Sequence, residues 1–374
     1  MKVKLGNYIK EYSVRNKSEE DIPVYSVTNT QGFCRDYFGK EVASKDKSTY
    51  KIVPRGYFAY NPSRINVGSV DWQRSEERVI VSPLYNVFSV SDELDQQYLF
   101  YFLKSDIGLH LIKAAATGSV RDNLKFSMLC DFQINLPSVS EQRTIVNNLD
   151  RLQSIINHRK DELQKLDDLI KAQFVEMFGE PQKNQFGFRI VPLKDTCKVI
   201  TGNTPSRTVD EYYGDYIEWI KTDNIVSGIT NPTTAAESLS AKGMEVGRTV
   251  GADSILMACI AGSIASIGRV CVTDRKVAFN QQINAIVPNE YNIYFLYVML
   301  QLSKNYLVEE INMALKGILS KSKLENKKFI VPPMDLQEQF AEFVKQLDKS
   351  KFAVQKALDK AQLLFDSLMQ QYFG

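Results

Sequence analysis

The strongest constraint on this chain is an internal repeat with a period of about 195 residues, which is visible in the sequence itself. Similar stretches recur in the same order in both halves: residues 3–7 with 191–195, 53–58 with 250–255, 68–70 with 268–270, 98–105 with 294–301, Gly118 with Gly317, 132–142 with 329–339, and 177–179 with 372–374. Similar α/β segments could produce such matches independently, but the constant order favours a tandem duplication. We therefore expect two copies of one folding unit.

Each copy begins with a region that mixes strand-like and helix-like patterns. Runs such as RVIVSPLYNVFSV and DSILMACIAG are typical of strands, and they lie among turn signals such as Asn61-Pro62 and Asn231-Pro232. An amphipathic helix follows near residues 98–116 in the first copy and near residues 293–315 in the second. These patterns predict two globular α/β domains, over residues 1–131 and 181–326.

Each copy ends in a long helical segment with a heptad pattern, over residues 132–180 and 327–374. Steps of four and three residues alternate along both seams, and most of the seam residues are apolar. The first seam contains Ile145, Leu149, Leu152, Ile156, Arg159, Leu163, Leu166, Ile170, Gln173 and Met177. The second contains Phe340, Val344, Leu347, Lys351, Val354, Leu358, Ala361, Phe365, Leu368 and Tyr372. A heptad sustained over this length predicts helix packed on helix, with an ordinary surface helix as the alternative.

The repeat and the heptads together predict the fold class. We expect an α/β protein in which a tandem repeat of two globular α/β domains is separated by two long helices pairing as an antiparallel coiled coil. The antiparallel arrangement follows if the repeats are related by a pseudo-two-fold axis, which would place a globular domain at each end of a dumbbell. At about 1.5 Å per residue, each helix is on the order of 50–60 Å long.

The composition excludes several other classes of protein. With 44% hydrophobic and 24% charged residues, the chain is typical of a soluble globular protein, and no apolar run approaches the roughly 18 residues of a membrane span. The first residues lack the apolar stretch of a secretion signal. Five cysteines without a C-x-x-C pair favour a reducing, cytoplasmic setting over a disulfide framework or a zinc site. The net charge of +2 gives no indication of a nucleic-acid partner.

Recognisable catalytic motifs are absent from the sequence. There is no G-x-x-x-x-G-K-[ST] loop for nucleotide phosphates, and Pro332-Pro333 lacks the flanking residues of a DNA amino-methyltransferase motif. The two histidines, His110 and His158, fit solvated positions better than a ligand site. We therefore predict a chain without a catalytic site, a metal or a cofactor of its own.

Particular stretches resemble the specificity subunits of type I restriction–modification systems, and the resemblance covers the whole chain. PSVSEQRTIV (137–146) and PPMDLQEQFAEFV (332–344) are similar to the family's helix starts, and QFVEMFGEPQ (173–182) is similar to its first helix end. In the first domain, GYFAYNPSRINVGSV (56–70) and VSPLYNVF (81–88) resemble one class of target-recognition domain. In the second, ITGNTPS (200–206), IEWIKTDNI (217–225), ASIGRV (265–270) and FNQQINAIVP (279–288) resemble another. The first domain has no G-x-T-P-S, so the two domains should read different sequences.

The resemblance implies a mechanism in which this chain performs no chemistry. Each target-recognition domain would bind one half of a bipartite site in double-stranded DNA, and the helices would span the unread spacer. Two methyltransferase subunits with S-adenosylmethionine would dock on the helices, and motor–nuclease restriction subunits with ATP and Mg would join to cut unmodified DNA. The setting would be the cytoplasm of a bacterium or archaeon. The alternatives are a coiled-coil protein-interaction scaffold and a standalone DNA-binding regulator.

Candidate contact residues follow from residue type and position. Arginine pairs well with guanine, and asparagine or glutamine with adenine. The candidate DNA-binding residues are Arg64, Asn66, Arg74, Arg121 and Asn123 in the first domain, and Arg207, Lys221, Asn224, Arg269, Gln281, Lys316 and Lys321 in the second. Apolar residues outside the seams are candidates for partner binding: Val146, Ile155, Leu169, Phe174, Phe178, Phe343, Phe352, Leu364 and Phe373. Packing on the chain's own domains is the alternative for this second set.

Overall fold

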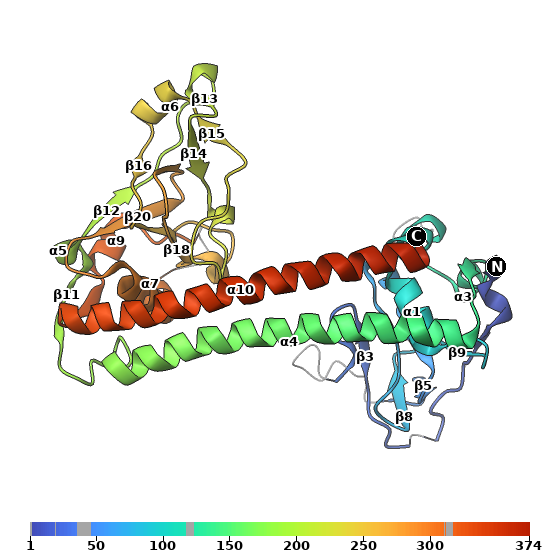
Figure 1. Ribbon diagram of the computed structural model, residues 1–374. Helices are drawn as coiled ribbons and strands as arrows, with labels where there is room; N and C mark the ends of the chain where they lie inside the picture. Colours follow the sequence, from blue (N-terminus) through green and yellow to red (C-terminus); the bar gives the residue numbers. More distant parts are fainter. Residues whose placement is uncertain (1, 19, 36–45, 117–122, 310, 312–316) are drawn as a thin grey trace. The chain divides into compact units, whose positions relative to one another are not determined.

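The computed structural model describes residues 2–18, 20–35, 46–116, 123–309, 311 and 317–374, and it divides into two compact units (Figure 1). Unit 1 contains residues 1–159 and 357–374, and unit 2 contains residues 160–356. Each of the two long helices, α4 (Val139–Phe178) and α10 (Met334–Phe373), contributes one part to each unit. Both helices are 40 residues long, which corresponds to about 60 Å.

Unit 1 contains a four-stranded antiparallel sheet in the order β2-β9-β6-β7 and three two-stranded sheets. The strands of the larger sheet are β2 (Ile9–Glu11), β9 (Asn86–Val90), β6 (Phe58–Tyr60) and β7 (Val70–Trp72). The two-stranded sheets pair β1 (Lys2–Lys4) with β10 (Gln133–Asn135), β3 (Ser26–Thr28) with β4 (Gly32–Cys34), and β5 (Lys51–Pro54) with β8 (Arg78–Val81). Unit 1 also contains the 3-10 helices η1 (Leu5–Asn7) and η2 (Ile65–Val67).

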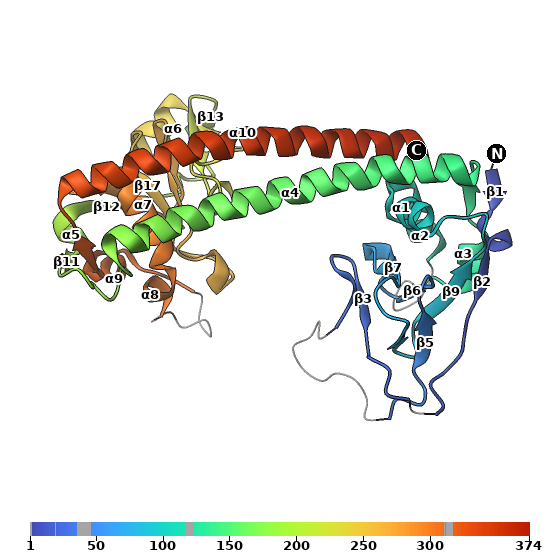
Figure 2. The ribbon, with the colours of Figure 1, turned by 60° about the horizontal axis from the view of Figure 1, so that its bottom comes forward.

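The helices of the first domain are α1 (Gln96–Lys104), α2 (Asp106–Ala115) and α3 (Phe126–Cys130). Figure 2 shows α1 and α2 between α4 and the four-stranded sheet. The single helix predicted near residues 98–116 is thus two helices, which meet at Ser105. The Ser105 hydroxyl donates to the Phe102 carbonyl at 2.7 Å and accepts from the Gly108 amide at 3.1 Å. It therefore ends α1 and caps α2.

Unit 2 contains two larger sheets and the pair β11 (Arg189–Pro192) and β21 (Lys328–Val331). The first sheet, β12-β20-β17-β18, consists of β12 (Cys197–Thr201), β20 (Ile283–Pro288), β17 (Ile255–Ala258) and β18 (Val270–Val272). The second, β13-β15-β14-β19-β16, consists of β13 (Tyr213–Gly214), β15 (Ser238–Leu239), β14 (Ile217–Ile220), β19 (Val277–Phe279) and β16 (Thr249–Val250). In this second sheet β14 and β19 pair in parallel, whereas the other pairs are antiparallel. The second domain is therefore mixed in strand direction, and it is also larger in strand content.

The helices of the second domain are α5 (Leu193–Thr196), α6 (Ala241–Val246), α7 (Ile293–Leu302), α8 (Lys304–Val308) and α9 (Lys321–Asn326). The 3-10 helices are η3 (Asp210–Tyr212), η4 (Thr222–Asn224) and η5 (Ile264–Ser266). The helix predicted near residues 293–315 is interrupted at Ser303, which is the C-cap of α7 and the N-cap of α8. Part of its predicted end lies outside the described residues. Both domains therefore break this helix at a serine.

The two repeats fold alike, as the sequence predicts. The sheet order β2-β9-β6-β7 of the first domain has its counterpart in β12-β20-β17-β18 of the second. Gly68 and Gly268, which the sequence pairs, both adopt positive φ, at 89° and 77°. The match of residues 132–142 with 329–339 is wrong by two residues. The Leu5 amide donates to the Phe132 carbonyl, whereas the amide of its counterpart Leu193 donates to the Lys327 carbonyl. The counterpart of residues 132–142 is therefore 327–337, not 329–339.

The heptad seams pack as predicted, and every seam residue is buried or half-buried. In unit 2, Phe174 of α4 packs against Phe340 of α10, and Asp167 pairs with Lys351. The contact nearer the end of α4 thus lies nearer the start of α10, so the two helices are antiparallel. In unit 1, the Asn148 side chain donates to the Tyr372 hydroxyl at 3.3 Å. α4 ends at Gly179, whose φ of 73° and hydrogen bond to Val175 fit a glycine C-terminus.

Candidate nucleic-acid interface

The loop of residues 202–207 follows β12 and forms the centre of the candidate interface in the second domain. Gly202 donates to the Ile283 carbonyl at 3.0 Å, and a Cβ at Gly202 would lie 2.1 Å from the Asn280 carbonyl oxygen. Only glycine therefore fits here. The Thr204 hydroxyl donates to Gln281, which brings this candidate to the same loop. The fold thus places the G-x-T-P-S motif and Gln281 side by side, although they are far apart in the sequence.

A cluster of charged and aromatic side chains lies beside this loop. The Arg207 guanidinium stacks over the Tyr213 and Trp219 rings, at 4.5 and 5.2 Å from their centroids. Glu237 forms ion pairs with Arg207, at 2.6 Å, and with Lys221. Hydrogen bonds from Lys221 and Arg207 hold the pKa of Glu237 below its ordinary value. Two candidate residues, Arg207 and Lys221, are therefore brought together and held by one carboxylate, while Arg207 remains exposed.

The structure adds Arg248, which the sequence analysis missed. Its backbone amide donates to the Asn203 side chain at 2.7 Å, which places Arg248 next to this loop, and the residue is exposed. Arg248 lies in an unremarkable stretch before β16, so only the fold brings it to residues 202–207. We define Arg207, Arg248 and Gln281 as the loop cluster of the second domain.

Other candidates in the second domain stabilise the domain itself. Asn224 is buried: its side-chain oxygen accepts from the Lys221 amide at 3.0 Å, and its NH2 group donates to Thr233 and Thr234. The Arg269 guanidinium donates to the carbonyls of Ser266 and Thr222. These contacts use the whole amide of Asn224, which corrects its assignment as a DNA-binding residue, whereas the half-buried Arg269 remains a candidate. Lys321 is exposed on α9, distant in sequence from the loop cluster, and forms an ion pair with Glu325 at 3.5 Å. Lys316 lies outside the described residues.

In the first domain, Arg74 is held by a network of its own. Its guanidinium donates to Asp71 at 2.9 Å and to Gln97 at 3.1 Å, and it stacks over Trp72 at 4.3 Å. Gln97 in turn donates to Asp150 on α4 at 3.4 Å. Arg74 thus joins the sheet, α1 and the long helix, and it is exposed on one side.

The remaining described candidates of the first domain lie around one turn. Arg64 and Asn66 flank the start of η2, and Arg64 is exposed. The Leu124 amide donates to the Pro62 carbonyl at 3.1 Å, which places the exposed Asn123 next to this turn. Arg121 lies outside the described residues. The first domain therefore presents Arg64, Asn66 and Asn123 from neighbouring segments.

Four of the partner-binding candidates on the long helices are core residues. Phe174 and Phe178 are fully buried and pack on Phe295 of α7 and on Phe340. Val146 and Phe373 are buried in the core of unit 1, where Phe373 packs on Tyr98 and Phe102. Their assignment as a docking surface is wrong, because each globular domain covers these faces of its own helices.

The other apolar candidates remain exposed on the helices. Phe352 is 73% exposed, Leu364 is 50% exposed, and Ile155 and Leu169 are 46% exposed. Phe343 is half-buried. Leu363, at 73% exposed, was not among the candidates. These side chains remain candidates for partner binding, because exposed apolar patches commonly mark interaction surfaces.

The described residues contain no group of three or more His, Cys, Asp or Glu side chains that could hold a metal ion. Within the same residues, no helix has the length and apolar character needed to cross a membrane. The buried thiols of Cys197, Cys259 and Cys271 have pKa values raised by burial to about 12, so they are unsuited to act as nucleophiles at neutral pH.

Both repeats match a model of the type I restriction modification DNA specificity domain, over residues 2–166 and 187–363. The chain belongs to this family. It is a specificity subunit with two such domains, and members of this family contribute DNA specificity and no catalysis.

Similar proteins support the assignment to the specificity family. The chain is 25% identical over 303 residues to the type I restriction enzyme MjaIX specificity subunit of Methanocaldococcus jannaschii, a match covering 74% of this chain and 68% of that one. It is 32% identical over 117 residues to the HindI specificity subunit of Haemophilus influenzae, covering 31% and 25% of the two chains.

Two solved structures share the fold over the whole chain. One is the type I restriction–modification S subunit from M. genitalium, with a TM-score of 0.60 and 15% identity, covering 96% of that chain. The other comes from work on complex assembly and conformational transition of the type I system, with a TM-score of 0.56 and 17% identity, covering 97% of that chain.

Proposed function

We propose that this specificity subunit reads a bipartite, asymmetric DNA target, one half with each globular domain. The observation that carries the proposal is that two domains of one specificity family present unlike polar loops. The second domain has the loop cluster Arg207, Arg248 and Gln281, and the first has the turn with Arg64, Asn66 and Asn123. Unlike donor sets on similar scaffolds suit unlike base sequences.

An exchange of domains tests this proposal. Residues 1–131 are replaced with the first domain of another family member, and the methylated sites are mapped by single-molecule sequencing in a host that carries the complete operon. We expect one half-site to change and the other to remain. A change in both halves would contradict the division between the domains.

We further propose that the exposed apolar residues of the long helices form the docking surface for two methyltransferase subunits. Phe352, Leu364, Ile155 and Leu169 support this proposal through their exposure. S-adenosylmethionine would bind to those subunits, and ATP and Mg to motor–nuclease subunits that join the complex. The assembled complex would act in the cytoplasm on double-stranded DNA.

Membership of the specificity family argues against the two alternative functions, a pure scaffold and a standalone regulator. A pure coiled-coil scaffold would use the same exposed helix faces but would not bind DNA. A standalone regulator would bind DNA without methyltransferase subunits. Purification of the tagged chain from its own host distinguishes the three functions. DNA-dependent methylation in the purified complex supports the proposal, whereas a stable DNA-binding chain without methyltransferase supports the regulator.

A further inference from the structure

A chain of polar contacts in unit 2 connects the second recognition domain to both long helices. The Thr230 hydroxyl, in the loop after η4, donates to the Asp348 carboxylate on α10 at 3.3 Å. Asp348 lies 3.9 Å from the Lys351 ammonium one turn further along α10. Lys351 in turn pairs with Asp167 on α4 at 2.7 Å. The contacts thus run from the domain through α10 to α4.

This chain of contacts lies at the packed seam of the helices, where polar groups are costly. The Lys351 side chain is 13% exposed, Asp348 is 24% exposed and Asp167 is 29% exposed. Lys351 is the polar residue of the second heptad seam, between Leu347 and Val354. A polar residue at such a position typically fixes the register of paired helices at a cost in stability.

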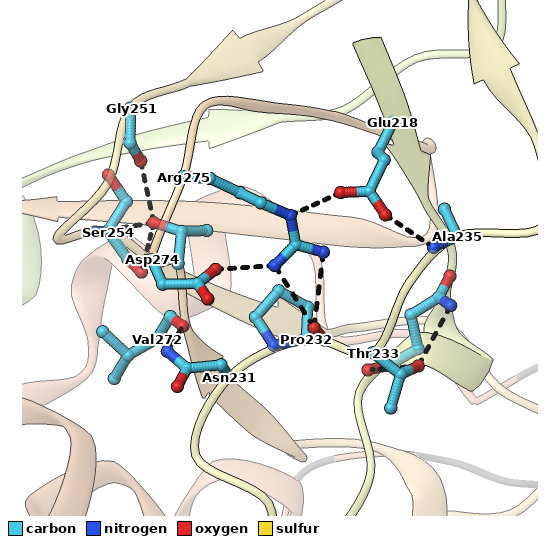
Figure 3. A network of polar contacts seen from close by, with 12 residues as sticks. Glu218, Asn231, Pro232, Thr233, Ala235, Gly251, Ser254, Val272, Asp274 and Arg275 are labelled. Carbon is cyan, nitrogen blue, oxygen red and sulfur yellow. Dashed lines mark hydrogen bonds and ion pairs between the residues drawn. The ribbon is translucent and has the colours of Figure 1, made fainter. Parts of the chain in front are cut away.

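The loop that carries Thr230 is hydrogen-bonded to the rest of the recognition domain, and Figure 3 shows its next residues, Asn231, Pro232 and Thr233. Arg275 lies between Glu218 and Asp274, and donates to both, while Glu218 also accepts from the Ala235 amide at 2.8 Å. The Asn231 side chain donates to the Val272 carbonyl of β18 at 2.8 Å. The Val272 amide donates to the Thr230 carbonyl at 2.7 Å. Hydrogen bonds therefore connect the Thr230 loop directly to β18.

Three of these residues line a cavity of about 430 Å³ between the two helices and the domain. Asp167, Lys351 and Asp348 lie on its helix side, and Tyr297 and Arg269 lie on its domain side. Because a cavity remains at this part of the boundary, apolar packing constrains the domain less here than at the aromatic core nearer the end of α4. The polar contacts add a constraint at this point.

We propose that Thr230, Asp348, Lys351 and Asp167 are positioning residues that fix the angle of the second recognition domain on the helix pair, and thereby determine which spacer length is accepted. The inference rests on the proposed function. Adding one base pair to the spacer moves a half-site by about 3.4 Å and rotates it by about 34°. A domain held at one angle rejects that displacement, whereas a domain free to tilt tolerates it.

The test measures spacer discrimination separately from base discrimination. Methylated-base sequencing in a host with the complete operon gives the wild-type target. Plasmids then carry the same half-sites with the wild-type spacer, or with one base pair more or less, and methylation rates are compared. The variants are Lys351→Met, the isosteric Thr230→Val and the conservative Lys351→Arg. Lys349→Met, an exposed position on the same helix, is the matched control.

We expect Lys351→Met to reduce the preference for the wild-type spacer about tenfold, and Thr230→Val to reduce it in the same direction. Lys351→Arg and Lys349→Met should retain it, and single-base discrimination within the half-sites should be unchanged in all variants. If Lys351→Met does not fold, as judged by circular dichroism, Thr230→Val decides. Unchanged spacer preference in a folded variant would overturn the inference. A wild-type complex that methylates without regard to any half-site would overturn the proposed function, and the inference with it.

Discussion

Gln142 and Gln337 make two equivalent hydrogen bonds in the two repeats. The Gln142 NH2 group donates to the Pro137 carbonyl at 2.9 Å and its oxygen accepts from the Asp95 amide at 2.8 Å. The Gln337 NH2 group donates to Pro332 at 2.8 Å and its oxygen accepts from the Asn292 amide at 2.9 Å. Both side chains are fully buried. Each glutamine thus joins the first turn of a long helix to the N-cap of the preceding domain helix.

We expect Gln142→Leu and Gln337→Leu each to destabilise the protein by about 1–3 kcal/mol, because buried backbone groups lose their partners. Chemical denaturation monitored by circular dichroism measures the free energy of unfolding. Gln153→Leu is the control, since Gln153 contacts Asn157 on the same helix and is not part of the junction. Equal effects at all three positions would contradict a special role for the junction.

Exchange of Phe352 for Asp should prevent binding of the methyltransferase while the chain stays folded. A large apolar side chain buried at an interface contributes about 1–3 kcal/mol, and a carboxylate there adds a desolvation cost. Phe174→Asp should instead unfold unit 2, because Phe174 is fully buried. Co-purification and circular dichroism distinguish the two outcomes. Gln346→Asp, at another exposed position of α10, is the control. Retained assembly by folded Phe352→Asp would place the docking surface elsewhere.

Replacement of Arg248 with Ala should weaken recognition of the half-site read by the second domain. The loss of one arginine contact to a base or phosphate costs about 1–3 kcal/mol in binding. A labelled duplex is titrated with the purified complex at several salt concentrations. This distinguishes a base contact from a phosphate contact, because loss of a phosphate contact changes the salt dependence of the binding affinity. Lys349→Ala, at an exposed position of α10 outside the candidate interface, is the control. Equal affinities for wild type and Arg248→Ala would remove Arg248 from the interface.

Exchange of Asp348 for Asn should make unit 2 at least as stable as wild type at pH 7. Burial raises the pKa of Asp348, despite the opposing effect of Lys351, so the folded state disfavours the ionised carboxylate. The resulting cost is fully present above the folded pKa and disappears as the pH falls below the unfolded value. The advantage of Asp348→Asn should therefore shrink toward pH 4. In a Trp72→Phe background, Trp219 fluorescence reports unfolding of unit 2. If wild type instead lost stability relative to Asp348→Asn as the pH falls, the raised pKa of Asp348 would be contradicted.

The repeat, the two long helices and the heptad seams could all be predicted from the sequence. These features depend on local spacing: a seam residue is apolar because every third or fourth position faces the partner helix. Ile145 and Phe340 could be placed in a seam from their spacing before any contact was known. The matching glycines Gly68 and Gly268 were similarly visible, since positive φ strongly favours glycine.

Which apolar helix residues are core and which are exposed depends on the packing of distant segments, and the sequence does not reveal it. Phe174 and Phe352 look alike in the sequence, because both lie outside the seams, yet Phe174 is covered by Phe295 and Phe352 is not covered. The covering residue comes from a helix more than a hundred residues away, which periodicity does not reveal. The same holds for Arg248, which long-range strand pairing brings to Asn203, and for Asn224, whose amide is used within its own loop.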